Sequence, residues 1–212
     1  MLSRRFAQQG VTLIELVVSL TILGLLFGLG VPSFRGWIQN AQIRTAAEAI
    51  QNGLQLARVE AVRRNITVRF QLTNTATNAC ALSATGANWV VSLNNAAGKC
   101  ANAAADPPLP PAIPDPANPY IIQARSAAEG SPNVAVSTDP ATTTIIFNGL
   151  GRLTPVPAGN INITVSSPSS GTCVQPGETA GIRCLRVVVS MDGQVRMCDP
   201  AVTLATDLRV CP

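Results

Sequence analysis

A single carboxylate, that of Glu15, interrupts an apolar run in which a charge is costly. The run extends for about 21 residues, from Val11 to Val31, and no other residue in it is charged. An ionised side chain in a hydrocarbon environment costs roughly 2.5–3.5 kcal/mol on insertion scales. The position of Glu15 therefore predicts that its carboxylate either pairs with a positive charge or has a dedicated function.

The apolar run is longer than that of an ordinary secretory signal. Such signals have an apolar core of about 7–15 residues and then a cleavage site of the Ala-x-Ala kind. No such site follows this run. About 20 apolar residues suffice to cross a bilayer, so a plain single-pass anchor explains the length, and it places Arg4 and Arg5 on the cytoplasmic side. It explains neither Glu15 nor the glycine, Gly10, at the boundary.

The junction between leader and apolar run resembles that of a type IV prepilin, the precursor of a pilus-like filament subunit. The six residues that carry the resemblance are Gly10-Val11-Thr12-Leu13-Ile14-Glu15. The resemblance implies that a membrane-embedded prepilin peptidase cleaves after Gly10 and N-methylates Val11, where most members of the family carry Phe. It also implies that Glu15 pairs with the terminal amine of a neighbouring subunit in the filament. Such an attraction is far stronger in apolar surroundings than in water.

The helix is expected to continue beyond the apolar run. A continuous helix from about Thr12 to Arg64 would be roughly 80 Å long at 1.5 Å per residue. Pro32 lacks an amide hydrogen, and we expect it to kink or loosen this helix. Apolar residues in its second half recur at steps of three and four, which predicts a face that packs on a core. They are Phe34, Trp37, Ile38, Ala41, Ala46, Ile50, Leu54, Ala57 and Ala61.

Past Arg64 the apolar pattern changes from a helical period to alternation. Residues 66–72 alternate apolar and polar side chains, as in a half-buried strand. Asn148-Gly149 and Asp192-Gly193 are turn dipeptides, and the second predicts a hairpin with a two-residue turn. Seven further strands are expected at Trp89–Leu93, Tyr120–Arg125, Val134–Ser137, Thr143–Phe147, Ile161–Ser166, Cys184–Ser190 and Gln194–Cys198.

The order of elements, one long helix and then an antiparallel β domain, is the lollipop-shaped pilin architecture, and we predict an α+β fold of this class. Within it, three segments resemble the GspH/FimT family of minor pilins and pseudopilins. They are residues 57–64 at the helix end, residues 147–152, and residues 185–200.

The resemblance implies a division of the chain and a location for each part. The protein is expected in the bacterial inner membrane as a single-pass subunit, with its C-terminal domain in the periplasm. We expect a leader peptide over residues 1–10, a transmembrane and filament-core helix over 11–32, the amphipathic half of the same helix over 33–65, and a β-rich domain over 66–212.

All six cysteines lie beyond the apolar run, and an even number in an exported domain argues for disulfides formed in the periplasm. No Cys-x-x-Cys pair and no histidine is present, so a zinc site fits poorly. With a two-residue turn at Asp192-Gly193, Cys184 and Cys198 would point to opposite sheet faces and should not bond. We expect sequence neighbours to pair: Cys80 with Cys100, Cys173 with Cys184, and Cys198 with Cys211.

The composition argues against catalysis. Without histidine, Ser-His and Cys-His nucleophile systems and histidine metal sites are excluded. The eleven carboxylates are scattered along the chain, and no phosphate-binding loop or nucleotide fingerprint is present. We therefore expect no enzymatic activity, no cofactor and no metal, and the resemblance makes this protein a substrate of the prepilin peptidase.

Two non-enzymatic roles remain open. One is structural: a minor subunit that primes or caps a type IV pilus or a type II secretion pseudopilus, in contact with other pilins and the inner-membrane assembly platform. The other is recognition, because some members of the FimT branch bind DNA during natural transformation through a Gly-Arg-x-Arg motif. This chain reads Gly193-Gln194-Val195-Arg196 there, without the first arginine. The candidates for phosphate contacts, which would weaken steeply with salt, are Arg183, Arg186, Arg196 and Arg209.

Overall fold

The computed structural model describes residues 11–107, 115–168, 173–178 and 181–212. The chain divides into two compact units, Met1–Ile38 and Gln39–Pro212. Helix α1, Leu13–Arg64, begins in the first unit and ends in the second. The expected leader, with Gly10 at its end, lies outside the described residues.

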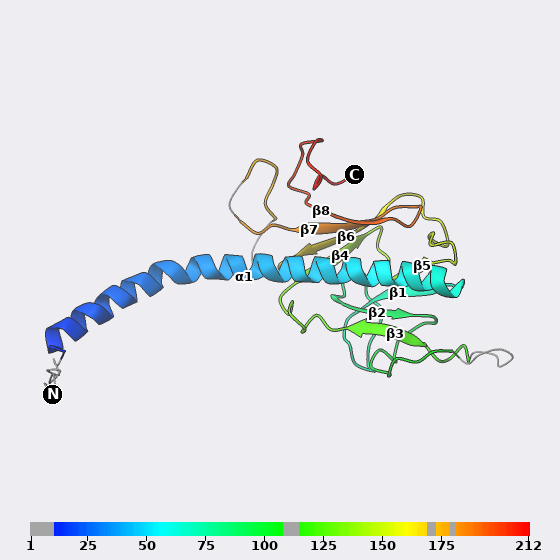
Figure 1. Ribbon diagram of the computed structural model, residues 1–212, viewed down its shortest axis with the longest axis horizontal. Helices are drawn as coiled ribbons and strands as arrows, with labels where there is room; N and C mark the ends of the chain where they lie inside the picture. Colours follow the sequence, from blue (N-terminus) through cyan, green and yellow to red (C-terminus); the bar gives the residue numbers. More distant parts are fainter. Residues whose placement is uncertain (1–10, 108–114, 169–172, 179–180) are drawn as a thin grey trace, which may run out of the picture. The chain divides into compact units, whose positions relative to one another are not determined.

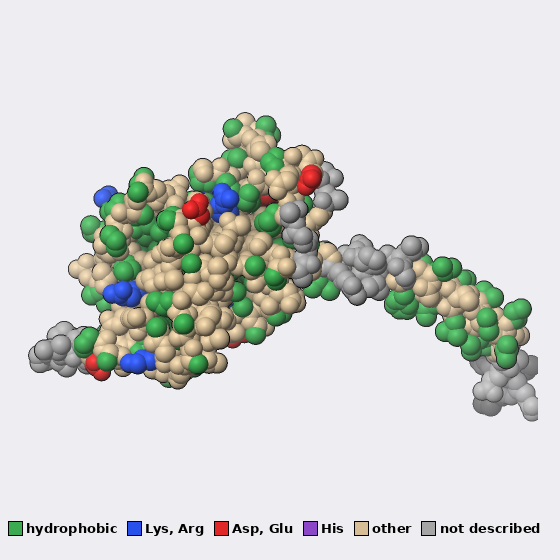
Figure 2. Space-filling view, turned by 180° about the vertical axis from the view of Figure 1, so that it is seen from behind, with side chains coloured by type: hydrophobic (Ala, Val, Ile, Leu, Met, Phe, Trp, Pro, Cys, Tyr) green, Lys and Arg blue, Asp and Glu red, His purple; other side chains and the backbone are tan. Residues whose placement is uncertain are grey.

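The first unit contains the start of α1, where Thr12 caps the helix. The Thr12 hydroxyl accepts a hydrogen bond from the Glu15 amide at 3.3 Å, which satisfies one of the free amides of the first turn. Every large hydrophobic side chain between Val11 and Phe27 is at least 48% exposed. Figure 2 shows these side chains along the helix.

Two expectations concern this part of the helix. Pro32 lies within α1, but the side chains of residues 28–33 and 35 are outside the description, so the kink stays a prediction. Judged by length and mean hydropathy together, none of the helices in the described residues qualifies as a membrane-spanning segment.

In the second unit, eight strands among the described residues form two antiparallel sheets of four (Figure 1). The first sheet has the order β3-β2-β1-β5 and the second the order β4-β6-β7-β8. Each of the eight predicted strands is confirmed, with ends within two residues of those predicted. The strands are β1 Val68–Thr73, β2 Asn88–Ser92, β3 Ile121–Arg125, β4 Ala135–Asp139, β5 Thr144–Phe147, β6 Ile161–Ser166, β7 Leu185–Val189 and β8 Val195–Cys198.

The second half of α1 forms one continuous core with both sheets. Buried helix residues such as Ile50 and Leu54 belong to the same cluster as Phe70 of β1 and Val187 of β7. Full burial of an aliphatic or aromatic side chain stabilises the fold by about 1.5–3 kcal/mol. The contact is close at Gly53, where a Cβ atom would lie 2.8 Å from the Phe70 ring. Only a residue without a side chain fits there.

The predicted apolar face of α1 is confirmed for residues 46–61 and wrong for residues 34–41. Ala46, Ile50, Leu54, Ala57 and Ala61 are all at most 5% exposed. By contrast, Phe34, Trp37, Ile38 and Ala41 are exposed. Periodicity identifies the apolar face of a helix, but it does not show which residues of that face are buried in the folded chain.

The C-terminal end of α1 is closed by a Schellman motif. Asn65 adopts a left-handed conformation with φ of 52°, which asparagine tolerates better than most residues. The Ile66 amide donates to the carbonyl of Ala61, and the Asn65 amide donates to that of Val62. These bonds satisfy carbonyls that the helix end leaves free, and they turn the chain directly into β1.

Two loops pack against this helix end through glycines. Arg58 donates from Nε to the Gly151 carbonyl at 3.1 Å. A Cβ atom at Gly149 would lie 2.4 Å from Oδ1 of Asn65, and one at Gly193 would lie 2.2 Å from the Gly151 oxygen. The helix end, the loop after β5 and the turn between β7 and β8 therefore contact one another at positions where only glycine fits.

The β7–β8 hairpin corrects the predicted register. Val189 pairs with Val195 and Arg186 with Cys198, so each pairing differs by one residue from that of a two-residue turn. The loop includes Met191 as well as the predicted turn dipeptide, and Gly193 adopts φ of 85°, as in a turn followed by a bulge. Consequently Cys184 and Cys198 fall on the same sheet face, and the predicted reason against their bonding was wrong.

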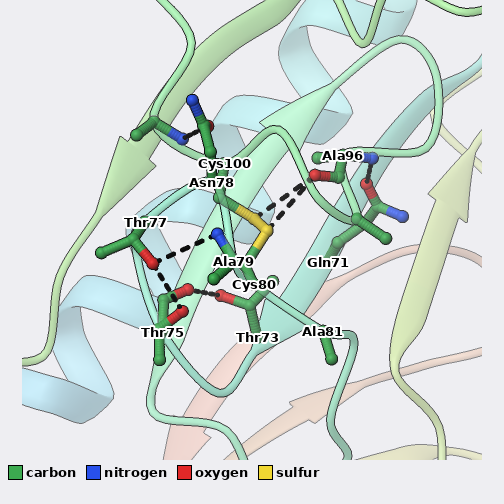
Figure 3. Close-up of a disulfide and its surroundings, with 12 residues drawn as sticks. Gln71, Thr73, Thr75, Thr77, Asn78, Ala79, Cys80, Ala81, Ala96 and Cys100 are labelled. Carbon is green, nitrogen blue, oxygen red and sulfur yellow. Dashed lines mark hydrogen bonds between the residues drawn. A yellow bond between two sulfur atoms is a disulfide. The ribbon is translucent and has the colours of Figure 1, made fainter.

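The structure contains three disulfides, each between cysteines that are neighbours in sequence. The bonds join Cys80 with Cys100, Cys173 with Cys184, and Cys198 with Cys211. The first closes the region around β1 and β2, and Figure 3 shows both of its sulfurs directed at the Ala96 carbonyl oxygen, 3.4 Å away. Disulfide sulfurs carry no proton, so these are contacts rather than hydrogen bonds.

Next to this disulfide, Gln71 of β1 is a buried polar residue, only 1% exposed. Its Oε1 accepts hydrogen bonds from the Ala96 amide at 2.9 Å and the Ser92 hydroxyl at 3.2 Å. Its Nε2 donates to Oδ1 of Asn95 at 3.3 Å. A buried amide costs free energy unless it is hydrogen-bonded, and here both ends have partners.

Substitution of Gly193 tests the contact at the helix end. Gly193→Ala should lower the free energy of unfolding by about 2–4 kcal/mol, because it adds a clash to an unfavourable backbone conformation. Gly98→Ala is the matched control, since Gly98 also has positive φ, 75°, but no neighbouring atom lies within 4 Å of the place that the new methyl group would take. The control should lose only about 1 kcal/mol. Denaturant unfolding of the oxidised protein measures both, and equal losses would contradict the close contact.

Candidate functional site

The N-terminal candidates lie on the exposed start of α1. Val11 is 72% exposed and Glu15 lies in the first turn. Within the described residues, the Glu15 carboxylate has no ion-pair partner. Gly10, on the other side of the expected cleavage site, lies outside the described residues.

Glu15 also has a local structural role that the sequence analysis missed. Thr12 and Glu15 have the spacing of a capping box, in which a Thr at the cap is followed three residues later by Glu. The Thr12 half of this arrangement is present. A carboxylate in the first turn also stabilises the helix by interacting with its dipole. The Thr-x-x-Glu spacing is the sequence signal that could have revealed this role.

The second candidate region is a cleft of about 420 Å³ in the unit Gln39–Pro212, which we call the arginine cleft. It lies between α1, the ends of β7 and β8, and the C-terminal segment. Its lining residues are Asn40, Arg44, Arg183, Leu185, Met197, Cys198, Asp199 and Arg209.

Asp199 is the buried charge of the arginine cleft, at 4% exposure. Its Oδ1 accepts a hydrogen bond from the Ala201 amide at 2.9 Å, and its Oδ2 lies 3.3 Å from the Arg183 guanidinium. Asn40 fixes the same region, because its Oδ1 accepts the Arg183 amide hydrogen at 2.9 Å. A buried carboxylate needs such partners, and breaking a buried pair by removing one partner is strongly destabilising.

The other two cleft arginines also have carboxylate partners. Arg44 donates from Nε to Glu48 at 2.8 Å, and both side chains are largely exposed. Arg209 donates two hydrogen bonds to Asp207, at 3.1 and 2.7 Å. The hydrogen bonds from Arg209 lower the pKa of Asp207 to about 2. Exposed pairs of this kind contribute little stability, so they can exchange partners at low cost.

The four arginines proposed for phosphate contacts do not form one site. Arg183 and Arg209 line the arginine cleft, whereas Arg186 and Arg196 lie on the other face of the β7–β8 hairpin. Arg186 donates to the Thr164 hydroxyl, and Arg196 donates to the Val210 carbonyl. On the face of the molecule that Figure 2 shows, Lys and Arg side chains are scattered among polar and apolar ones. We predicted a single set of arginines because the sequence does not show which face of the sheet each one occupies.

A further charged cluster lies at the end of α1 and has a structural role. Glu60 accepts hydrogen bonds from Arg63 and Arg64 at 2.7 Å, and Arg64 also bonds Asp106 at 2.7 Å. Partial burial would raise the pKa of Glu60, but the hydrogen bonds from the two arginines outweigh it and lower this pKa. The cluster ties the helix end to the loop after residue 100. Within the described residues, no group of three or more side chains could hold a metal ion.

Comparison with known families identifies the chain. The family model of the type II transport protein GspH matches residues 46–193. The chain belongs to the GspH family. The prokaryotic N-terminal methylation motif matches residues 5–31, a range that includes Gly10, Val11 and Glu15. The GspH match covers α1 from Ala46 onward and strands β1 to β7, and it ends in the β7–β8 turn.

Two crystal structures of the Pseudomonas aeruginosa type IV minor pilin FimU are similar to this GspH-family chain. One has 15% sequence identity and a TM-score of 0.43, and the match covers 73% of this chain and 90% of that chain. The other has 16% identity and a TM-score of 0.44, with coverage of 73% and 87%. No curated protein sequence gives a significant match.

The Arg209–Asp207 pair gives a pH prediction. The pKa of Asp207 is lower in the folded protein, about 2, than its ordinary value of 3.8. The pair therefore contributes stability above about pH 4 and loses this contribution as the pH falls toward about 2. NMR titration of the Asp207 carboxyl carbon should show this value, and Arg209→Gln should return it toward 3.8. An ordinary pKa in the unaltered protein would contradict the pairing.

Proposed function

We propose that this GspH-family protein is a minor subunit of a type IV pilus or of a type II secretion pseudopilus. Its N-terminal helix anchors it in the bacterial inner membrane before assembly, and the unit Gln39–Pro212 lies in the periplasm. Prepilin peptidase removes residues 1–10 and methylates Val11. No catalytic activity is part of this proposal. The partners are other pilins or pseudopilins, the peptidase and the inner-membrane assembly platform.

The observation that carries the proposal is the environment of the Glu15 carboxylate. Its carboxylate lies within the matched methylation motif, among exposed apolar side chains, and it has no ion-pair partner in the described residues. An unpaired charge in apolar surroundings is costly, so burial of this helix requires a cation. A terminal ammonium at Val11 of a neighbouring subunit supplies one.

This pairing would fix the register of assembly. Apolar helices slide past one another with little change in free energy, since hydrophobic contact is not directional. One charge pair in a low-dielectric interior has a strong dependence on distance, because its energy falls as the inverse of separation. The Thr12 cap defines where the helix begins and thereby the position of Glu15 relative to the new terminus.

Substitution of Glu15 tests the proposal. Glu15→Gln keeps the shape of the side chain and removes its charge, so membrane insertion and cleavage after Gly10 should be unchanged. Incorporation into filaments should fall by about tenfold or more, because breaking a buried charge pair costs about 3–5 kcal/mol. Quantitative immunoblots of sheared filaments and of membranes measure both pools.

Glu129→Ala is the matched control, since Glu129 is an exposed carboxylate in the other unit. It should be incorporated at the level of the unaltered protein. Incorporation of Glu15→Gln at the same level would contradict the role of Glu15.

A further inference from the structure

Three exposed apolar residues at the end of the first unit have no role in the contacts described so far. Phe34 is 66% exposed, Trp37 is 70% exposed and Ile38 is 47% exposed. They follow one another at steps of three and one, and positions three and four apart share one face of a helix. We call these three residues the aromatic patch. Contiguous exposed apolar side chains mark a surface that contacts a partner, whereas isolated ones are common.

The aromatic patch follows a segment whose length matches the thickness of a membrane. Residues 16–34, between the charged residues Glu15 and Arg35, contain no Asp, Glu, Lys or Arg. At 1.5 Å per residue, a helix over this segment is about 28 Å long. The hydrocarbon core of a bilayer is about 30 Å thick. With Glu15 at one edge of the core, the aromatic patch therefore lies at the opposite edge.

The hydroxyl groups within this segment are already satisfied by the helix itself. The Ser19 hydroxyl donates a hydrogen bond to the Glu15 carbonyl at 2.7 Å, and the Thr21 hydroxyl donates to the Val18 carbonyl at 2.8 Å. Hydrocarbon offers no hydrogen-bond partner, so polar groups in a membrane must find one within the protein. Both side chains are thus compatible with a lipid environment.

Trp37 has the chemistry of a residue at a membrane–water interface. Its ring is apolar, and its Nε1–H group is a hydrogen-bond donor that has no acceptor in the part of the chain that the structure describes. Tryptophan is enriched at such interfaces, because its ring contacts acyl chains while its N–H reaches polar groups. Gln39, which follows the aromatic patch, begins the second unit, the one that we place in the periplasm.

We propose that the aromatic patch binds the periplasmic membrane–water interface and fixes the depth of α1 in the inner membrane before assembly. The occupant is phospholipid, whose phosphate and ester oxygens accept a hydrogen bond from Trp37 and whose acyl chains contact Phe34 and Ile38. The inference rests on the proposed function, since it concerns the subunit before it enters a filament. Glu15 at one edge and Trp37 at the other then prevent the apolar helix from sliding across the membrane.

Depth-dependent fluorescence quenching tests the proposal with the full chain in vesicles of phosphatidylethanolamine and phosphatidylglycerol. Bromine atoms, which quench indole on contact, are placed on the acyl chains either near the headgroup or near the methyl end. The other tryptophan, Trp89, is buried in the second unit, at 3% exposure. Trp37→Phe therefore gives the Trp89 emission alone, and subtraction gives that of Trp37. Shallow bromine should quench Trp37 about twofold more than deep bromine, and neither should quench Trp89.

A variant that exchanges two aromatic residues is the matched control. Phe27 lies near the middle of the uncharged segment and is 62% exposed. Phe27→Trp combined with Trp37→Phe keeps the composition but moves the indole by about 15 Å along the helix. Deep bromine should quench this variant more strongly than shallow bromine does.

Flotation of the vesicles measures insertion separately from depth. Inserted protein whose Trp37 is quenched by neither probe, equally by both, or more by deep bromine would overturn the proposal and leave the proposed function intact. Quenching by neither probe would mean that water or protein, rather than lipid, surrounds the aromatic patch. Stronger quenching by shallow bromine at both positions 27 and 37 would mean that the helix lies along the membrane surface. That result would contradict the membrane anchor of the proposed function as well, as would protein that does not float.

Discussion

The close approach of α1 to the first sheet is the constraint on which the rest of the second unit depends. Gly53 lets the Phe70 ring contact the helix backbone, and the alanines at positions 46, 47, 57 and 61 are all at most 5% exposed. Because core packing tolerates few voids, this contact fixes the position of both sheets on one helix. At the C-terminal end of α1, two loops pack closely as well. Gly149 lies against Asn65, and Gly193 lies against the Gly151 carbonyl. The first unit has no such constraint in the described residues, since its apolar side chains face outward.

The difference between the two units leads to the functional conclusion. In the second unit, buried polar groups such as Gln71 and Asp199 have partners within the chain. In the first unit, the carboxylate of Glu15 is unpaired among exposed apolar side chains in the described structure. Under the proposed function, the second unit is held together by contacts within the chain, and the first unit is the part that contacts neighbouring subunits. The proposed filament contact supplies those neighbours.

Much of the fold could be predicted from the sequence, because local patterns determine it. The apolar run and the helical period after it predicted α1 with its start within one residue of Leu13, and all eight strands were predicted with ends within two residues of those observed. The errors came from non-local causes. Phe34 and Trp37 follow the helical period but are exposed, and the Asp192-Gly193 dipeptide does not show that Met191 joins the loop. For the same reason, the arginine cleft could not be predicted: Arg44, Arg183, Asp199 and Arg209 come together only when the C-terminal segment folds beside β8.

The central claim is that this chain is processed as a prepilin and assembles through its new N-terminus. Mass spectrometry of the protein purified from its own membranes tests this claim most directly. The account predicts a mature protein that begins at Val11 with a methylated amine and lacks residues 1–10. Retention of Met1, or a mature terminus at any other residue, would contradict it.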